Sequence, residues 1–281
     1  MEYKTLNGLT LPVLAFGTGA MGPNYCVEPA RDSARIRAIK AAIDQGITHI
    51  DTAERYGGGR AEELIAEAIK GYDRDKLFIT SKVLPQNLHY KSVLSSAHYS
   101  SRRLRTHIDL YLVHSPNPSI PLEGTMRAMD QLVDTGVVRF IGVSNFSVQD
   151  MEDAQKYSKN QLVANEIEYS LLARNQAPDC KEMESEIIPY CRAHNMFVIA
   201  YKALARGQLA CPGHHFLDQI AERYGKTQAQ VALRWLIQQE DILALTQAIA
   251  PEHLQDSVGA LGWKLGTADM ERLTLEMGRE S

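Results

Sequence analysis

Four residues with chemically useful side chains follow apolar, strand-like segments in the first half of the chain. Asp51 ends the run His-Ile-Asp, and Tyr56 follows it just before three glycines. Lys82 ends Ile-Thr-Ser-Lys, and His114 ends Tyr-Leu-Val-His. Each of these residues alone is commonly a turn former, a surface charge or a structural group. Together, after three successive strands, they point to one shared site.

Such a set of side chains suits proton transfer to a carbonyl oxygen. A phenol has a pKa of about 10 in water and is a weak acid at neutral pH. A neighbouring ammonium lowers that pKa, and a carboxylate beside the ammonium keeps it charged. We therefore expect Tyr56 to be a general acid that Lys82 tunes. Asp51 would hold Lys82, and His114 would orient a carbonyl oxygen.

The rest of the chain alternates short apolar segments with helical patterns, which predicts the scaffold for these groups. Residues 1–8 and 9–13 read as a β-hairpin around Asn7-Gly8. The strands expected after it are residues 14–17, 48–51, 77–82, 107–114, 137–144, 162–167, 197–201 and 242–246. The expected helices are residues 31–45, 62–69, 92–104, 122–135, 149–158, 184–194, 216–224, 227–238 and 252–261.

Eight such units in 281 residues predict an α/β fold of the (β/α)8 TIM-barrel type, with an N-terminal β-hairpin and residues 1–281 as one domain. In this fold the carboxyl ends of the strands meet at one mouth, where active sites form. An open doubly wound sheet is the alternative, since residues 17–22 match G-x-G-x-x-G. Pro23 follows at once, however, and the next expected helix starts only near Arg31, so these glycines do not open a helix.

Composition limits the partners of the chain. It is 44% hydrophobic and 23% charged, with a formal net charge of −4 and no run of Lys and Arg, so no nucleic-acid partner is expected. No apolar stretch approaches the ~20 residues of a membrane helix, and the N-terminus lacks signal-peptide features. We expect a cytoplasmic protein without a membrane partner. The four cysteines have no metal-binding spacing and are expected to be reduced thiols.

Along essentially its whole length the chain resembles the aldo-keto reductase family. The catalytic tetrad of that family matches Asp51, Tyr56, Lys82 and His114, and the segment G-V-S-N-F at residues 142–146 is a further hallmark. The resemblance implies a nicotinamide-dependent oxidoreductase that reduces an aldehyde or ketone to an alcohol. A small-molecule carbonyl compound would be its substrate, and Tyr56 would protonate the oxygen after hydride transfer.

The resemblance also implies where NADPH or NADH would bind. Ser144 and Asn145 would hold the nicotinamide carboxamide, and Tyr201 would stack on the ring. Lys202 and Arg206 lie where the family contacts the pyrophosphate. The expected cofactor-binding residues are Ser144, Asn145, Glu166, Tyr201, Lys202, Leu204, Arg206, Gln247, His253, Asp256 and Ser257.

Two departures from the family pattern concern the cofactor. The family usually has Gln where this chain has Glu166, whose charge would favour the oxidised, cationic nicotinamide unless the side chain turns to solvent. The family also carries a basic clamp for the 2′-phosphate of NADPH after the last strand. Residues 246–257 contain no Lys or Arg, and only His253 could carry a positive charge there. Either NADPH or NADH is therefore expected.

Short segments around the mouth predict an open substrate pocket. Its expected lining includes Phe16, Met21, Tyr25 and Pro85. Two other functions stay open from the residues: a redox-neutral lyase or isomerase that uses Tyr56 and Lys82, and a regulatory protein that senses the cofactor.

Overall fold

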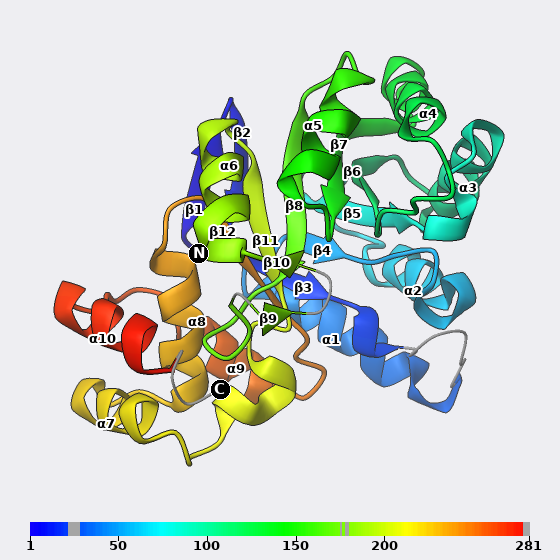
Figure 1. The fold of residues 1–281 in the computed structure, drawn as a ribbon. Helices are drawn as coiled ribbons and strands as arrows, with labels where there is room; N and C mark the ends of the chain where they lie inside the picture. The colour runs from blue at the N-terminus through cyan, green and yellow to red at the C-terminus, as the bar shows by residue number, and fades with distance from the viewer. Residues whose placement is uncertain (22–28, 175, 178–179, 278–281) are drawn as a thin grey trace.

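A closed barrel of eight parallel strands forms the centre of the computed structural model, which describes residues 1–21, 29–174, 176–177 and 180–277 (Figure 1). Its strands are β3 (Leu14–Gly17), β4 (His49–Asp51), β5 (Phe78–Val83), β6 (Ile108–Val113), β7 (Val138–Ser144), β8 (Leu162–Glu168), β11 (Phe197–Tyr201) and β12 (Ile242–Thr246). The strands pair in chain order, and β12 pairs with β3 to close the ring. The predicted (β/α)8 fold is confirmed, and the open doubly wound alternative is wrong.

Helices cover the outside of this ring (Figure 1). They are α1 (Asp32–Asp44), α2 (Arg60–Ala68), α3 (Tyr90–Leu104), α4 (Leu122–Asp134), α5 (Val148–Lys156), α6 (Ile188–Ala193), α7 (His215–Tyr224), α8 (Gln228–Gln238), α9 (Pro251–Val258) and α10 (Thr267–Met277). Capping boxes start α5 and α8, where Ser147 and Thr227 each accept a hydrogen bond from a backbone N–H of the first turn.

Three features differ from the predicted elements. Residues 184–194 were expected to be one helix, but a π-helical turn over Met183–Ile187 precedes α6. Pro189, near the start of α6, has no N–H to continue a regular ladder from the preceding turn. Helix α10 was not predicted. Neither was the short pair β9 (Gln176–Ala177) and β10 (Cys180–Lys181), which is antiparallel.

Strands β1 (Tyr3–Leu6) and β2 (Leu9–Pro12) form the predicted hairpin. Asn7 and Gly8 have φ angles of 48° and 78°, as a two-residue turn with two left-handed positions requires. The hairpin packs on the end of the barrel where the strands start. Leu11 is 1% exposed and shares an apolar cluster with Phe78 and Phe197, the first residues of β5 and β11.

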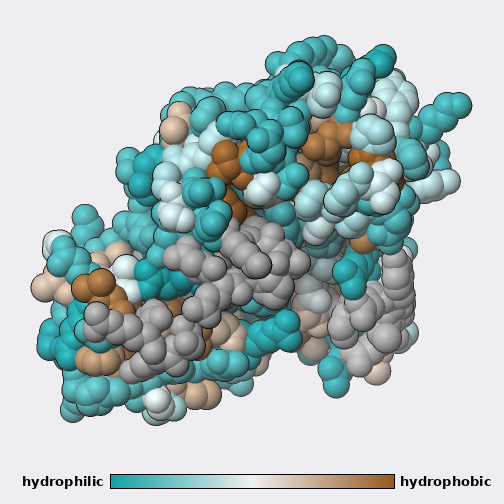
Figure 2. Space-filling view, viewed as in Figure 1, coloured by the Kyte–Doolittle hydropathy of each residue, from teal (hydrophilic) through white to brown (hydrophobic). Residues whose placement is uncertain are grey.

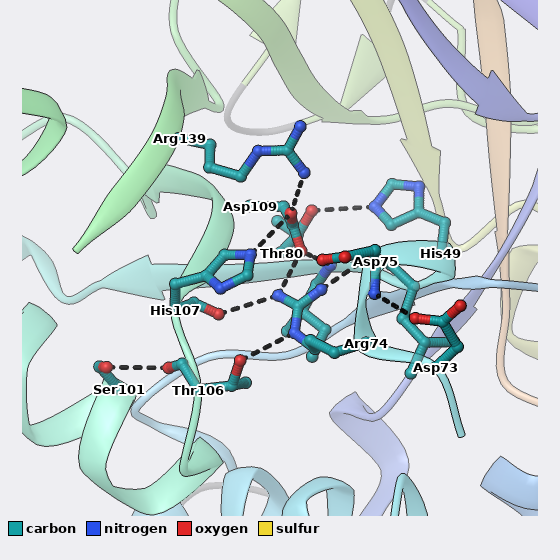
Figure 3. A network of polar contacts seen from close by, with 12 residues as sticks. His49, Asp73, Arg74, Asp75, Thr80, Ser101, Thr106, His107, Asp109 and Arg139 are labelled. Atoms are coloured by element: carbon teal, nitrogen blue, oxygen red, sulfur yellow. Dashed lines mark hydrogen bonds and ion pairs between the residues drawn. The ribbon is translucent and has the colours of Figure 1, made fainter. Parts of the chain in front are cut away.

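A buried carboxylate ties strands together at that same end (Figure 3). Asp109 on β6 accepts hydrogen bonds from Arg74 at 2.5 Å, from Arg139 at 2.7 Å and from the backbone N–H of Ile79 at 2.8 Å. Its side chain is fully buried, and three donors satisfy the carboxylate charge, as burial demands. The network fixes the starts of β5, β6 and β7 relative to one another.

The outer surface is mainly hydrophilic, with small separate apolar groups on the face that Figure 2 shows. A much larger apolar cluster lies between the strands and the helices, and a smaller one fills the barrel. None of the described helices is long and apolar enough to cross a membrane.

Candidate active site

The ends of β4 and β5 bring Asp51 and Lys82 into direct contact. Lys82 Nζ lies 2.5 Å from Asp51 Oδ1 and donates a second hydrogen bond to the carbonyl oxygen of Thr52 at 3.2 Å. Lys82 is fully buried, so its charge needs a partner. Burial opposes the ammonium, but the carboxyl groups of Asp51 and Glu166 outweigh burial and raise the pKa of Lys82 above its ordinary value. The ammonium is therefore present at neutral pH.

The ring of Tyr56 lies near both an ammonium and an imidazole. Lys82 Nζ is 5.7 Å from the centroid of the Tyr56 ring, and the ring meets His114 edge-on, with centroids 6.0 Å apart. Burial raises the pKa of Tyr56 to about 12, although Lys82 acts in the opposite direction. The sequence-based expectation that Lys82 brings this pKa below 10 is wrong, because burial is the larger effect and the Asp51 and Glu166 carboxyls add to it.

His114 carries no charge at neutral pH. Burial, together with the positive charges of Lys82 and Arg55, lowers the pKa of His114 to about 3. Its Nδ1 atom is buried and has no hydrogen-bond partner among the described residues. A neutral imidazole can donate or accept a hydrogen bond at a substrate oxygen, as the sequence suggested, but it cannot serve as an acid. Arg55, which sequence reasoning missed, is an exposed neighbour of Tyr56 in the chain.

Glu166, on β8, faces into the site. The residue is 3% exposed, and Oε2 lies 3.2 Å from Lys82 Nζ, so the alternative of a Glu turned to solvent is wrong. Burial and the neighbouring Asp51 carboxylate raise the pKa of Glu166 well above its ordinary value. Burial thus favours the protonated form of Glu166 and weakens the negative charge that the sequence suggested near the nicotinamide.

Hydrogen bonds join the ends of β6, β7, β8 and β11 beside these groups. Ser144 Oγ donates to the carbonyl oxygen of Glu166 at 3.0 Å, and Asn145 Nδ2 donates to that of His114 at 3.1 Å. The Tyr201 hydroxyl donates to Asn145 Oδ1 at 2.8 Å. Asn145 has a φ of 59°, a conformation that non-glycine residues rarely adopt and that often marks functional positions. These residues surround the mouth at which the nicotinamide is expected.

A cleft of about 570 Å³ lies beside the mouth, between the segments that follow β11 and β12. Seven of the expected cofactor-binding residues line it: Lys202, Leu204, Arg206, Gln247, His253, Asp256 and Ser257. Ser144, Asn145, Glu166 and Tyr201 belong to the mouth instead. The cleft thus has the donors and cations that a dinucleotide needs, and its residues fit such a group.

The backbone that lines this cleft is unusual. Lys202, Ala205 and Arg206 have φ angles of 52°, 46° and 57°, although none of them is a glycine. Lys202 is also held by an ion pair with Glu168. The loop after β11 is thus kept in a costly conformation by its surroundings, which is common where a ligand binds. Ala210, Cys211 and Ala229 also line the cleft, and their residue types gave no sign of this role.

The expected lining of the substrate pocket is partly wrong. Phe16 and Met21 are 0% and 1% exposed, so they are core residues, because their side chains pack between the strands and helices. Tyr25 lies outside the described residues. Gly19 borders the phenol: a Cβ atom there would lie 3.5 Å from Cζ of Tyr56 and 3.0 Å from Nε2 of Gln247. A side chain at Gly19 would therefore crowd the space in front of the proposed acid.

Comparisons with known proteins agree with this geometry. The model of the Aldo/keto reductase family matches residues 13–275. Methylglyoxal reductase YeaE of Escherichia coli is 33% identical over 94% of this chain and 90% of its own length. The structure of the thermostable aldo-keto reductase Tm1743 with the inhibitor epalrestat has a TM-score of 0.92 and 37% identity, covering 99% of this chain and all of its own. An aldo-keto reductase of Klebsiella pneumoniae in complex with NADPH has a TM-score of 0.87 and 31% identity, covering 99% of this chain and 96% of its own.

Proposed function

Because the chain belongs to the aldo/keto reductase family, we propose that it reduces a small aldehyde or ketone to an alcohol, with a nicotinamide cofactor and with Tyr56 as general acid. The observation that carries the proposal is the position of the Tyr56 ring, near both the neutral imidazole of His114 and the paired ammonium of Lys82. Two relatives are named as reductases of methylglyoxal and glyoxal, and a small carbonyl compound fits an acid placed at the barrel mouth.

Each residue of the tetrad has its own role in the protonation of the carbonyl oxygen. A nicotinamide cofactor, held by the residues of the mouth and the cleft, would supply hydride for the carbonyl carbon. Tyr56 gives its proton to the carbonyl oxygen; its pKa of about 12 means that the phenol is fully protonated at neutral pH and ready to donate. Lys82, held by Asp51, stabilises the phenolate that remains. His114 orients the carbonyl oxygen toward the phenol.

The test is oxidation of reduced cofactor against a panel of small aldehydes and ketones, with a 2-oxoaldehyde first because of the Escherichia coli relative. Tyr56→Phe should lower kcat by roughly 100-fold or more, because it removes the acid and leaves the ring. Tyr99→Phe, which makes the same change at a side chain 58% exposed, is the matched control. Turnover of a carbonyl compound without cofactor oxidation would support a redox-neutral enzyme, and cofactor binding without any turnover would support a sensor.

We further propose that NADH is used at least as readily as NADPH. Residues 246–257 contain no Lys or Arg, and His253 and Asp256 are the ionisable side chains of this segment that line the cleft. A 2′-phosphate would therefore lack a strong cationic partner. Lys202 and Arg206, in the same cleft, suit the pyrophosphate that both cofactors share.

His253→Arg should tighten NADPH binding relative to NADH by roughly tenfold or more, because a charged hydrogen bond to a phosphate is worth about 1.5 kcal/mol or more. Fluorescence titration of each variant with both cofactors measures the change. Gln255→Arg adds the same charge to α9 at a residue that does not line the cleft, and it is the control. A wild-type protein that binds NADPH far more tightly than NADH would contradict the proposal.

A further inference from the structure

Lys82 has two buried carboxyl neighbours, where the tetrad provides only one. Asp51 approaches it from β4, the neighbouring strand, at 2.5 Å, and Glu166 approaches it from β8 at 3.2 Å. The side chains are 0%, 2% and 4% exposed for Lys82, Asp51 and Glu166. All three therefore interact in a dry environment, in which each charge needs a partner.

The charges of this cluster balance only if the two carboxyls share a proton. One ammonium can neutralise one carboxylate, and a second buried carboxylate without a cation is costly. Asp51 Oδ2 and Glu166 Oε2 are both buried, and neither accepts a hydrogen bond from a donor among the described residues. Both carboxyls lie against Lys82, so a proton carried by one of them would supply the missing donor. The titratable groups that face the cluster are Tyr56, His49 and His114, and the charge of Lys82 acts on all three. Burial and this charge lower the pKa of each of the two imidazoles to about 3, so neither is charged at neutral pH.

We propose that Glu166 is a second positioning residue for Lys82, which shares one proton with Asp51, so that either carboxylate alone can hold the ammonium beside the Tyr56 phenol. This inference rests on the proposed function, in which Lys82 supports the acid. In Asp51→Asn, Glu166 releases its proton and becomes the counter-ion. In Glu166→Gln, Asp51 stays ionised and the amide replaces the protonated carboxyl as a donor.

The double variant should therefore behave unlike either single variant. Each of Asp51→Asn and Glu166→Gln should lower kcat/KM by about tenfold or less, because one carboxylate remains. Asp51→Asn/Glu166→Gln should lose roughly 100-fold beyond the product of the single effects, as expected of coupled residues in direct contact. Asp51→Asn/Glu168→Gln is the control, because Glu168 lies on the same strand and pairs with Lys202 instead. Its two effects should multiply.

The pH profile separates this role from a merely structural one. Burial opposes the ammonium of Lys82, and the two carboxyls overcome that effect. Without either carboxylate the pKa of Lys82 should fall, so kcat/KM of the double variant should decline as the pH rises through the neutral range. The single variants, which keep a counter-ion, should show no such decline.

A measurement of stability without cofactor tests the role of Glu166 independently of the proposed reductase activity. Urea unfolding of the four cofactor-free proteins at pH 8 should show the same coupling, with the double variant less stable than the sum of the single effects. That result would stand even if no carbonyl compound were reduced. A double variant that does not fold, while both single variants do, supports the proposal. It is overturned if Asp51→Asn alone loses as much activity and stability as the double variant, or if the effects simply add.

Discussion

At the scale of single residues, the site depends on which groups keep their protons when they are buried. Burial disfavours the charged forms of Tyr56, Glu166 and His114. It therefore raises the pKa of the phenol and of the carboxyl, and it lowers the pKa of the imidazole. The phenol and the imidazole are therefore both uncharged at neutral pH, and the pKa of the Glu166 carboxyl lies well above its ordinary value. Lys82 is the exception, since two carboxyls overcome burial. The result is one stable cation beside a proton donor.

The neutral state of His114 predicts a loss of stability in acid. Its pKa of about 3 lies below the ordinary value of 6.5. Between these two pH values the imidazole is protonated in the unfolded chain but neutral in the folded protein. The stability from this group is complete above pH 6.5 and is lost as the pH falls toward 3. Between pH 7 and pH 5 the wild type should lose up to about 2 kcal/mol relative to His114→Asn.

Urea unfolding at the two pH values measures this difference. His98→Asn, which changes an exposed imidazole, is the matched control. An equal loss of stability for the wild type and His114→Asn on acidification would contradict a neutral, buried imidazole.

The approach of Asp51 to Lys82 could be predicted from the sequence, because each ends a strand and adjacent strand ends meet at the barrel mouth. The direction of Glu166 could not. Polar residues occupy both faces of β8, as Asn165, Glu166 and Glu168 show, so alternation gives no sign of the buried side. The direction in which the pKa of Tyr56 shifts could not be predicted either, because it depends on how deeply the ring is buried.

At the scale of elements, β7 and β8 approach each other closely at Gly142. A Cβ atom there would lie 2.7 Å from the carbonyl oxygen of Ala164 and 2.8 Å from Cδ2 of Leu112. The first contact is with backbone and cannot be relieved by a rotamer change. The hallmark glycine just before Ser144 and Asn145 is thus required by packing, and a shift of β7 would displace both side chains.

Gly142→Ala should therefore destabilise the protein by about 1–3 kcal/mol, the usual cost of overpacking a core. It should also weaken cofactor binding, because Ser144 ends the same strand and Asn145 follows it directly. Chemical denaturation and cofactor titration measure the two effects. Gly124→Ala in α4 has room for the new methyl group, with its nearest atom 4.0 Å away, and should be neutral or stabilising. Equal behaviour of the two variants would contradict the packing argument.

Strands were predicted better than the irregular elements. The bounds of β3, β11 and β12 agree with the sequence reading, because apolar runs with turn residues at both ends mark buried parallel strands. Helix α10 was missed, since it follows no strand and lies outside the β/α alternation. The cleft was predicted through the family resemblance rather than from residue types, because the loop geometry at Lys202 and Arg206 depends on tertiary contacts.

At the scale of the whole molecule, the hairpin closes the end of the barrel opposite the chemistry. Lys4 on β1 donates to the carbonyl oxygen of Ile242 at 2.7 Å, where β12 starts. Arg234 on α8 is buried and pairs with Glu2 at 2.8 Å. Leu11 packs beneath the strands. The hairpin is thus attached by polar contacts at its edge and by apolar contacts at its centre.

Leu11→Ala should cost about 2–5 kcal/mol of stability, as for other large-to-small changes in a core. The Michaelis constant for a carbonyl substrate should change little, because Leu11 is at the far end of the barrel. Leu275→Ala makes the same change at a side chain 60% exposed and is the control. A loss of stability below 1 kcal/mol would show that the hairpin covers the barrel without supporting it.

The Asp109 network and the hairpin together hold one end of the barrel, whereas the cleft is built from the loops that follow β11 and β12. Substitutions in those loops need not disturb the contacts at the other end of the barrel. The residues that determine stability are therefore different from the residues that determine which ligand binds. Such a separation favours evolvability. A laboratory search for new substrates could therefore diversify the loops freely and leave residues 1–12 and Asp109 untouched.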